Sequence, residues 1–131
     1  MGPVMLVFYP AAFTRVCTAQ VCDYRDRWAD FDEFGLTILG VSTDRPEKQA
    51  SWRASNSLPF PLLSDPDGAV ISKFTGTSRL MRGRAHRGNY IITQDGVIRY
   101  AHTEKVDLMR RGSDELLSRL RQLQGQGRLS G

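Results

Sequence analysis

The chain has 131 residues, of which 40% are hydrophobic and 24% charged, and this composition is typical of one folded domain spanning residues 1–131. Gly and Pro, at 12 and 6 residues, are too few for a collagenous or low-complexity chain. No apolar run approaches the roughly 20 residues of a membrane span, and no basic segment precedes the first apolar stretch. We therefore expect a cytoplasmic protein without a membrane partner.

The net charge of +4 is unevenly distributed. Residues 1–72 hold 6 Lys+Arg and 9 Asp+Glu, net −3, whereas residues 73–131 hold 12 and 5, net +7. The basic residues are spread over several predicted elements, without a basic tail or an aromatic stripe. This pattern favours a solvated face over a nucleic-acid partner. An anion-binding loop from Arg79 to Arg87 is kept as an alternative.

The first half of the chain predicts alternating strands and helices. The apolar run over residues 4–9 is typical of a buried strand, which Pro10 ends because proline has no N–H for a sheet ladder. Apolar residues at spacings of three and four predict a helix over residues 15–34, stopped by Gly35. The next predicted elements are a strand over 36–41, a helix from a cap at Thr43 or Asp44 to Asn56, and an extended edge segment over 58–63.

The second half predicts a hairpin and a final helix. Two β-rich runs, 89–93 and 97–101, flank an Asp-Gly turn, which is a strong hairpin signal. Ser113 opens a helix with leucines on one side. The other expected elements are a turn at 65–68 with a short helix through Phe74, an exposed loop over 75–88, and a frayed tail over 125–131 that leaves a core of 4–124.

The resulting order is β-α-β-α-(β)-α-β-β-α. A strand–helix–strand start followed by an antiparallel hairpin and a terminal helix predicts a thioredoxin-like three-layer α/β/α domain with a mixed central sheet. A flavodoxin-like sheet would need another parallel strand–helix unit where the Asp-Gly hairpin stands.

The two cysteines are the candidate reactive groups. Cys17 and Cys22 cannot build a disulfide framework, and with only His86 and His102 they make a poor zinc set. Cys17 falls in the first turn of the predicted helix, where unpaired N–H groups and the helix dipole stabilise a thiolate. The alternative is a buried cysteine that acts as a small hydrophobic residue.

Pro10 and Thr14 form the pattern P-x-x-x-T-x-x-C with Cys17, directly after the first strand. Thr14 has two interpretations. It is either a helix N-cap or a hydroxyl that accepts a hydrogen bond from one bound oxygen and donates to another. With the N–H of Cys17, such a hydroxyl would serve a peroxide, whose O–O bond develops charge as it breaks.

The stretch FYPAAFTRVCTAQVCDYRD, followed by GVSTD, PFPLLSDPDGAV and HRGNYIITQDGVIRY, resembles the peroxiredoxins. It is similar above all to the bacterioferritin comigratory protein or peroxiredoxin Q subfamily. The AFT and RG stretches also resemble one-cysteine alkyl hydroperoxide reductases of the E type. The match runs from residue 4 to about 123, and its active-site motif is highly specific.

This resemblance implies a role for each matching residue. Cys17 would be the peroxidatic cysteine, oxidised to sulfenic acid by hydrogen peroxide or an organic hydroperoxide. Thr14 would orient the peroxide, Pro10 would shield the thiolate, and Arg87 would supply a guanidinium to thiolate and peroxide. Gln20 stands where the family often has a residue that positions this arginine. No metal, haem or flavin is implied.

Cys22 matches the resolving cysteine of peroxiredoxin Q, which would form a disulfide with Cys17 for a thioredoxin-like or glutaredoxin-like reductant to reduce. Five residues of helix rise about 7.5 Å, whereas a disulfide allows about 7 Å between Cα atoms, so this bond requires the first helical turns to unwind. The alternative is that Cys22 packs in the core and an external thiol resolves Cys17. A redox-sensing or chaperone-like thioredoxin-fold module with little turnover is the competing function.

Two departures from the family pattern stand out. Arg15-Val16 replaces the usual Pro-Gly before the reactive cysteine. The chain also begins at the first central strand, so the family's N-terminal hairpin is expected to be missing. Its absence would expose apolar surface or a strand edge, which predicts a monomer or a weak homodimer.

Overall fold

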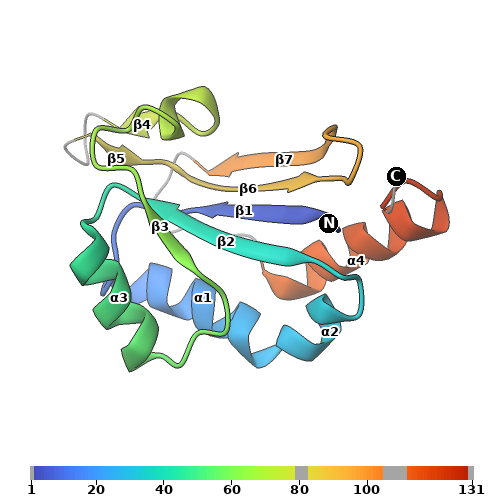
Figure 1. Cartoon of the computed structure of the whole chain (residues 1–131), viewed down its shortest axis with the longest axis horizontal. Helices are drawn as coiled ribbons and strands as arrows, with labels where there is room; N and C mark the ends of the chain where they lie inside the picture. The colour runs from blue at the N-terminus through green and yellow to red at the C-terminus, as the bar shows by residue number, and fades with distance from the viewer. Residues whose placement is uncertain (1, 79–82, 105–111, 130–131) are drawn as a thin grey trace.

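The computed structural model describes residues 2–78, 83–104 and 112–129. Its centre is a mixed five-stranded sheet in the order β3-β2-β1-β6-β7 (Figure 1). Strand β1 pairs in parallel with β2 and antiparallel with β6, while β2–β3 is parallel and β6–β7 antiparallel. The strands are β1 (Val4–Phe8), β2 (Thr37–Ser42), β3 (Leu62–Ser64), β6 (Arg87–Ile92) and β7 (Ile98–Glu104).

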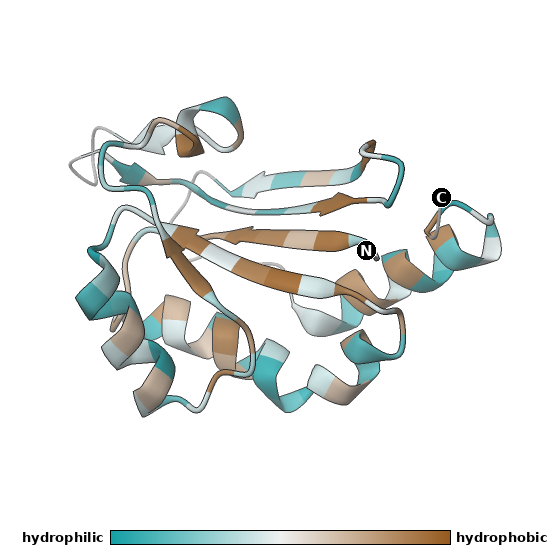
Figure 2. Cartoon of the chain, viewed as in Figure 1, coloured by the Kyte–Doolittle hydropathy of each residue, from teal (hydrophilic) through white to brown (hydrophobic). Residues whose placement is uncertain are grey.

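One face of the sheet carries the α-helices, which lie together beneath it in Figure 1. Alternate residues of β1, with Tyr9 just after it, point to this side and pack against buried residues of every helix, including Cys17, Phe31 and Trp52. Figure 2 shows the hydrophobic residues concentrated in β1 and β2, in the middle of the sheet and between the layers that pack on its two faces. The helices are α1 (Arg15–Asp26), α2 (Trp28–Asp32), α3 (Pro46–Ser55) and α4 (Ser113–Gly125).

The opposite face carries a thinner layer. It consists of a 3-10 turn, η1 (Ile71–Lys73), and a small second sheet of β4 (Thr77–Ser78) and β5 (Arg84–Ala85). Phe8, Phe74 and Tyr90 form an aromatic cluster here, with ring centroids 5.1 to 5.7 Å apart. The predicted mixed sheet between two layers is confirmed, although the second layer is thinner than the first.

The helix predicted over residues 15–34 is wrong in one respect, because it breaks into α1 and α2 at Arg27. The backbone of Arg27 leaves the helical region at φ −108° and ψ 20°, and its side chain donates to Asp30 and Asp114. The bend keeps the apolar residues of both pieces in the same core, so the periodicity continues across it.

The exposed loop expected over residues 75–88 is also wrong. Strands β4 and β5 occupy part of this segment, and Arg87 and Gly88 are buried residues of β6. The sequence hides these elements because they are very short and lack periodicity. Gly88 is needed where it stands, because a Cβ there would lie 2.8 Å from the carbonyl oxygen of His102. Residues 79–82, from the alternative anion-binding loop, lie outside the described residues.

The tail from residue 125 does not fray over its described part. Gly127 turns the chain with a φ of 70°, and the N–H of Arg128 donates to the carbonyl of Leu123. This turn places Leu129 in the main core, where it is buried. The buried leucine supplies the apolar contact that a fraying end lacks.

Within the described ranges, no helix has both the length and the apolar character that crossing a membrane requires.

Candidate active site

Cys17 lies in the first turn of α1, as the sequence predicts, and its side chain is completely buried. The loop from Tyr9 to Thr14 connects the end of β1 to this turn. Because β1 is the central strand, it delivers the loop to the middle of the sheet's carboxyl edge. Cys17 is a free thiol that belongs to the main core cluster.

Arg87 extends from the first residue of β6 to this sulfur. Its Nη1 donates to Cys17 Sγ at 3.1 Å and to Gln20 Oε1 at 2.8 Å, and the arginine is 1% exposed. A buried guanidinium is costly unless it is paired and hydrogen-bonded, so such an arrangement needs a compensating group nearby. The sulfur, the amide of Gln20 and the guanidinium therefore form one buried polar cluster.

Two further side chains support this cluster. Gln20 Nε2 donates to the Tyr24 hydroxyl at 3.2 Å, and Asn89 Nδ2 donates to the same hydroxyl at 3.1 Å. Asn89 lies two residues after Arg87 and therefore on the same face of β6. This chain of hydrogen bonds joins α1 to β6 next to the Arg87–Cys17 contact.

Thr14 stands at the N-cap position of α1, with extended backbone angles of −89° and 154°, but its side chain makes no cap hydrogen bond. Its Oγ1 instead donates to the carbonyl of Ala11 at 2.8 Å. Thr14 is therefore the N-cap residue by position, as one interpretation predicts, but its side chain does not cap the helix. The predicted donation from this hydroxyl to a bound oxygen is not available in this conformation, because its single proton is already donated to the carbonyl of Ala11.

Pro10 is buried at the end of the central strand, where the sequence places it. The preceding N–H, of Tyr9, still donates to β2 at Val41, and the ladder stops with the proline. Pro10 thus ends β1 and begins the loop that leads to Cys17.

Cys22 lies on α1 one and a half turns beyond Cys17 and is half-buried. Its Sγ contacts Asn56 Oδ1, at the C-terminal end of α3, at 3.5 Å. Arg25 Nη1 donates to the backbone carbonyl of Asn56 at 2.8 Å. The second half of α1 is therefore attached to the end of α3 by two side chains, and Cys22 carries no disulfide.

A second polar network, which the sequence did not indicate, lies behind the loop. Tyr9 Oη donates to Gln49 Oε1 at 2.6 Å, and Gln49 Nε2 donates to Ser42 Oγ at 3.0 Å. Ser42 Oγ in turn donates to Asp44 Oδ2 at 2.8 Å. Burial raises the pKa of Tyr9 well above its usual range, because it disfavours the phenolate, although the hydrogen bond with Gln49 opposes this effect. The stretch GVSTD was the available signal, because it contains both Ser42 and Asp44.

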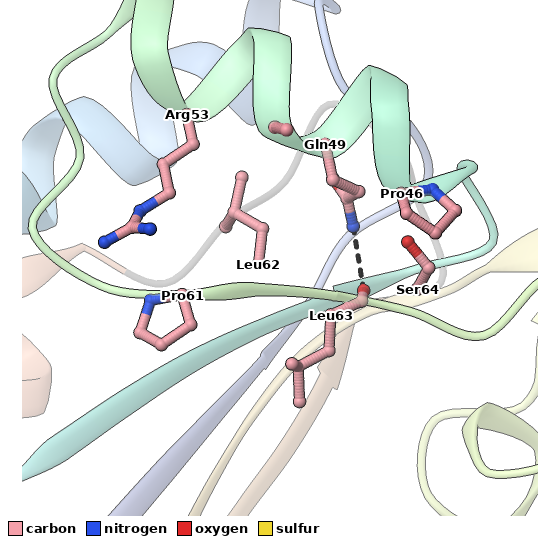
Figure 3. Close-up of a pocket in the computed structure, with 8 residues that line it drawn as sticks. Pro46, Gln49, Arg53, Pro61, Leu62, Leu63 and Ser64 are labelled. Atoms are coloured by element: carbon pink, nitrogen blue, oxygen red, sulfur yellow. Dashed lines mark hydrogen bonds between the residues drawn. The ribbon is translucent and has the colours of Figure 1, made fainter.

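A groove of about 380 Å³ lies between α3 and the edge strand β3 (Figure 3). Gln49 Nε2 reaches across it to the carbonyl of Leu63 at 2.8 Å, the dashed contact in Figure 3. None of the predicted site residues lines the groove.

Among the described residues, no group of three His, Cys, Asp or Glu side chains is arranged to hold a metal ion.

Three comparisons place this geometry among known proteins. The model of the AhpC/TSA family matches residues 1–101. A relative from Mycobacterium tuberculosis, named as a peroxiredoxin, is 42% identical over 100 residues, which cover 72% of this chain. The chain spans only 64% of the length of that curated relative.

Two solved structures are similar over nearly the whole chain. Peroxidoxin BcpB of Mycobacterium tuberculosis has a TM-score of 0.82 at 32% identity and covers 93% of this chain and 80% of its own. AhpC of Enterococcus faecalis has a TM-score of 0.87 at 24% identity, covering 96% and 77%, and this likeness concerns the fold. The predicted thioredoxin-like fold is confirmed, and the chain belongs to the AhpC/TSA family of peroxiredoxins.

Proposed function

We propose that this protein is a thiol-dependent peroxidase that reduces hydrogen peroxide and organic hydroperoxides at Cys17. The observation that carries the proposal is the buried contact of 3.1 Å between Cys17 Sγ and Arg87 Nη1. A guanidinium held this close stabilises negative charge on sulfur, and a thiolate is the nucleophile that attacks a peroxide. Family membership and a relative named as a peroxiredoxin support the same reaction.

In the proposed step, the Cys17 thiolate attacks one oxygen of ROOH and the O–O bond breaks. The leaving oxygen takes the bond's electron pair and a proton and departs as water or an alcohol, while Cys17 becomes a sulfenic acid. Arg87 stabilises the charge that develops on both the sulfur and the leaving oxygen. Gln20 holds the guanidinium in place through its 2.8 Å hydrogen bond.

Thr14 and Pro10 prepare the approach of the peroxide. Because the Thr14 hydroxyl donates to Ala11, its oxygen is left to accept a hydrogen bond from the peroxide O–H. Pro10, buried beside the same loop, limits the access of water to the thiolate. In this proposal Thr14 orients the hydroperoxide and Pro10 shields the thiolate from bulk water.

Cys22 then resolves the sulfenic acid: its sulfur displaces hydroxide, released as water, and forms the disulfide with Cys17. Both cysteines belong to the same continuous helix, so the start of α1 must unwind first. A thioredoxin-like or glutaredoxin-like dithiol reduces the disulfide and completes the cycle. We propose that this occurs in the cytoplasm, in a monomer or weak homodimer, which sedimentation at micromolar concentration tests.

The test is peroxide consumption with thioredoxin and its reductase, comparing wild type with Cys17→Ser and Cys22→Ser. We expect Cys17→Ser to be inactive and Cys22→Ser to undergo one oxidation without thioredoxin-supported turnover. An active Cys17→Ser variant would contradict the proposal. A single stoichiometric oxidation of the wild type, without cycling, would instead favour the redox-sensing module.

The unwinding has its own test. Hydrogen exchange of residues 15–25 is expected to be faster in the oxidised protein than in the reduced one. Equal protection in both forms would contradict an internal disulfide and favour an external resolving thiol.

A further inference from the structure

We propose that Asp44 is a positioning residue for peroxide reduction, because its carboxylate fixes the peptide unit that orients the Thr14 hydroxyl. This inference rests on the proposed peroxidase function. It concerns the peptide unit between Ala11 and Ala12, both of which are buried. The N–H of Ala12 donates to Asp44 Oδ2 at 2.6 Å, and the carbonyl of Ala11 accepts from Thr14 Oγ1 at 2.8 Å.

These two hydrogen bonds belong to a single planar group. The described chain contains no cis peptide bond, so the N–H and the C=O of this unit point in opposite directions. Asp44 therefore holds the unit from one side, and Thr14 bonds to it from the other. Rotation of the plane would break both hydrogen bonds together.

Asp44 is itself well held. Ser42 Oγ donates to the same oxygen, Oδ2, at 2.8 Å, and Lys48 Nζ lies 3.3 Å from the other oxygen, Oδ1. The side chain of Asp44 is only 8% exposed, so its bond with Ala12 is screened little by water. A hydrogen bond to a carboxylate is stronger than one between neutral groups, which makes Asp44 a firm anchor for the loop.

The loop needs such an anchor, because the next residue has an unfavourable conformation. Phe13 has a φ of 64°, a left-handed value that a bulky residue rarely adopts, and the residue is 52% exposed. Its described ring contact is with Trp52, at a centroid distance of 6.4 Å. A side chain this exposed does little to fix its own backbone. The hydrogen bond from the N–H of Ala12 to the Asp44 carboxylate therefore stabilises the turn into α1.

The contact with Asp44 affects peroxide reduction because it fixes the direction in which the Thr14 hydroxyl donates its proton. A carboxylate on the N–H polarises the peptide unit and makes its carbonyl a better acceptor. The Thr14 proton is then held on Ala11, and the lone pairs of Oγ1 face the peroxide. If the peptide unit rotates, the hydroxyl regains a free proton and competes for acceptors instead of accepting from the substrate.

The experiment uses the full chain with Cys22→Ser, so that Cys17 is the single thiol. Two second-order rates are measured for each variant: oxidation by hydrogen peroxide, followed by trapping the sulfenic acid with dimedone, and alkylation by iodoacetamide. Alkylation needs the Cys17 nucleophile but no hydroxyl that accepts from a peroxide, so it separates the two roles. The variants are Asp44→Ala, Asp44→Asn, the control Glu47→Gln, whose side chain is exposed on α3, and Thr14→Val alone and combined with each Asp44 variant.

We expect Asp44→Ala to slow peroxide oxidation roughly ten- to hundredfold, the effect of losing a hydrogen bond to a charged group, and to leave alkylation within about twofold. Asp44→Asn keeps an acceptor oxygen, so it should recover part of the rate and serves as the test variant if Asp44→Ala does not fold. Glu47→Gln should match the parent in both rates. In the Thr14→Val background, the substitutions at Asp44 should have almost no further effect.

Two results would overturn the proposal. One is an equal loss of oxidation and alkylation, which indicates a general structural role for Asp44. The other is an unchanged Asp44 effect in the Thr14→Val background, which indicates that Asp44 does not act through Thr14. If the parent with Cys22→Ser is not oxidised by peroxide at all, the proposed function itself fails, and this outcome differs from a normal parent with an unaffected Asp44→Ala variant.

Discussion

Cys17 and Cys22 lie five residues apart on one helix, yet their surroundings differ in burial and in charge. Cys17 is completely buried and lies 3.1 Å from a guanidinium nitrogen of β6. Cys22 is half-buried, and its sulfur contacts the neutral amide oxygen of Asn56 at 3.5 Å. A cation stabilises negative charge on sulfur, whereas an amide oxygen accepts a hydrogen bond from a thiol.

The contrast follows from the geometry of the helix. Five residues turn the helix about 140° beyond one full turn, so the two side chains leave on different faces. One face meets β6 and the other meets the end of α3, and these elements provide an arginine and an asparagine respectively. Two identical residues thus acquire different surroundings from what packs against the helix, and this difference supports the separate roles proposed for them.

The largest effect is expected from removing the cation beside Cys17. Arg87→Met should slow peroxide oxidation of Cys17 about 10²- to 10³-fold, because the charge that develops in the transition state loses its buried donor. Stopped-flow oxidation in the Cys22→Ser background measures this rate. The control is Arg84→Met, an exposed arginine three residues away, which should have no effect. A rate for Arg87→Met within threefold of the parent would remove the proposed basis of the contrast.

A smaller effect is expected from removing the hydrogen bond that holds the Arg87 guanidinium in place. Gln20→Met removes the oxygen that accepts from Arg87 Nη1 at 2.8 Å and keeps the volume of the side chain. Oxidation of Cys17 should slow roughly five- to tenfold, because the guanidinium remains but is no longer held. The double variant with Arg87→Met should be no slower than Arg87→Met alone, and additive losses would contradict a role through the arginine.

A substitution of Asn56, on α3's C-terminal end, tests the environment of Cys22. Asn56→Ala removes the acceptor of the Cys22 thiol, so part of the contact that holds α1 against α3 is lost. Formation of the Cys17–Cys22 disulfide after oxidation should accelerate about two- to fivefold, while the preceding oxidation is unchanged. Rapid acid quench and mass spectrometry separate the two steps. An unchanged or slower disulfide step would show that this contact does not restrain Cys22.

The smallest effect is expected far from both cysteines, at the turn between β6 and β7. The pKa of Asp95 lies below its usual value, first because Thr93 Oγ1 donates to its carboxylate and also because Val97 N–H and Arg99 do so. A lowered folded-state pKa contributes stability above the unfolded pKa, and this contribution is lost as the pH falls through the folded value. Asp95→Asn should therefore lower the urea midpoint slightly at pH 7 but not at pH 2. A difference that persists at pH 2 would assign the effect to the turn geometry instead.

Local patterns were sufficient for most of the sheet and helices. The apolar run over residues 4–9, the Asp-Gly hairpin and the leucines of the last helix each depend on neighbours close in sequence, so their periodicity was informative. The predicted helix over 15–34 failed at Arg27, where the backbone leaves the helical region although the apolar periodicity continues into α2. The loop predicted over 75–88 failed because β4 and β5 are only two residues long and pair with each other, and because β6 begins two residues before the run that the hairpin pattern indicates.

The residues of the candidate site also fall into two groups, those that a local motif indicates and those that it does not. Cys17, Thr14 and Pro10 form a motif within eight residues, and the sequence alone places them between a strand and a helix. Arg87 could be selected from fifteen arginines only through the family resemblance, since nothing local distinguishes it. Asp44 was considered only as a helix cap, although its carboxylate accepts from the loop that leads to Cys17.

By itself, the sequence determined the order of the main strands and helices, the thioredoxin-like fold class and the position of a cysteine at a helix start, because these depend on short-range periodicity and spacing. Only the tertiary structure decided which side chains surround each sulfur. The arginine comes from 70 residues away and the asparagine from 34, and the carboxylate behind the loop lies 32 residues from the N–H that it accepts. Such contacts arise when the strands pair and the helices pack on the sheet, and no local pattern encodes them.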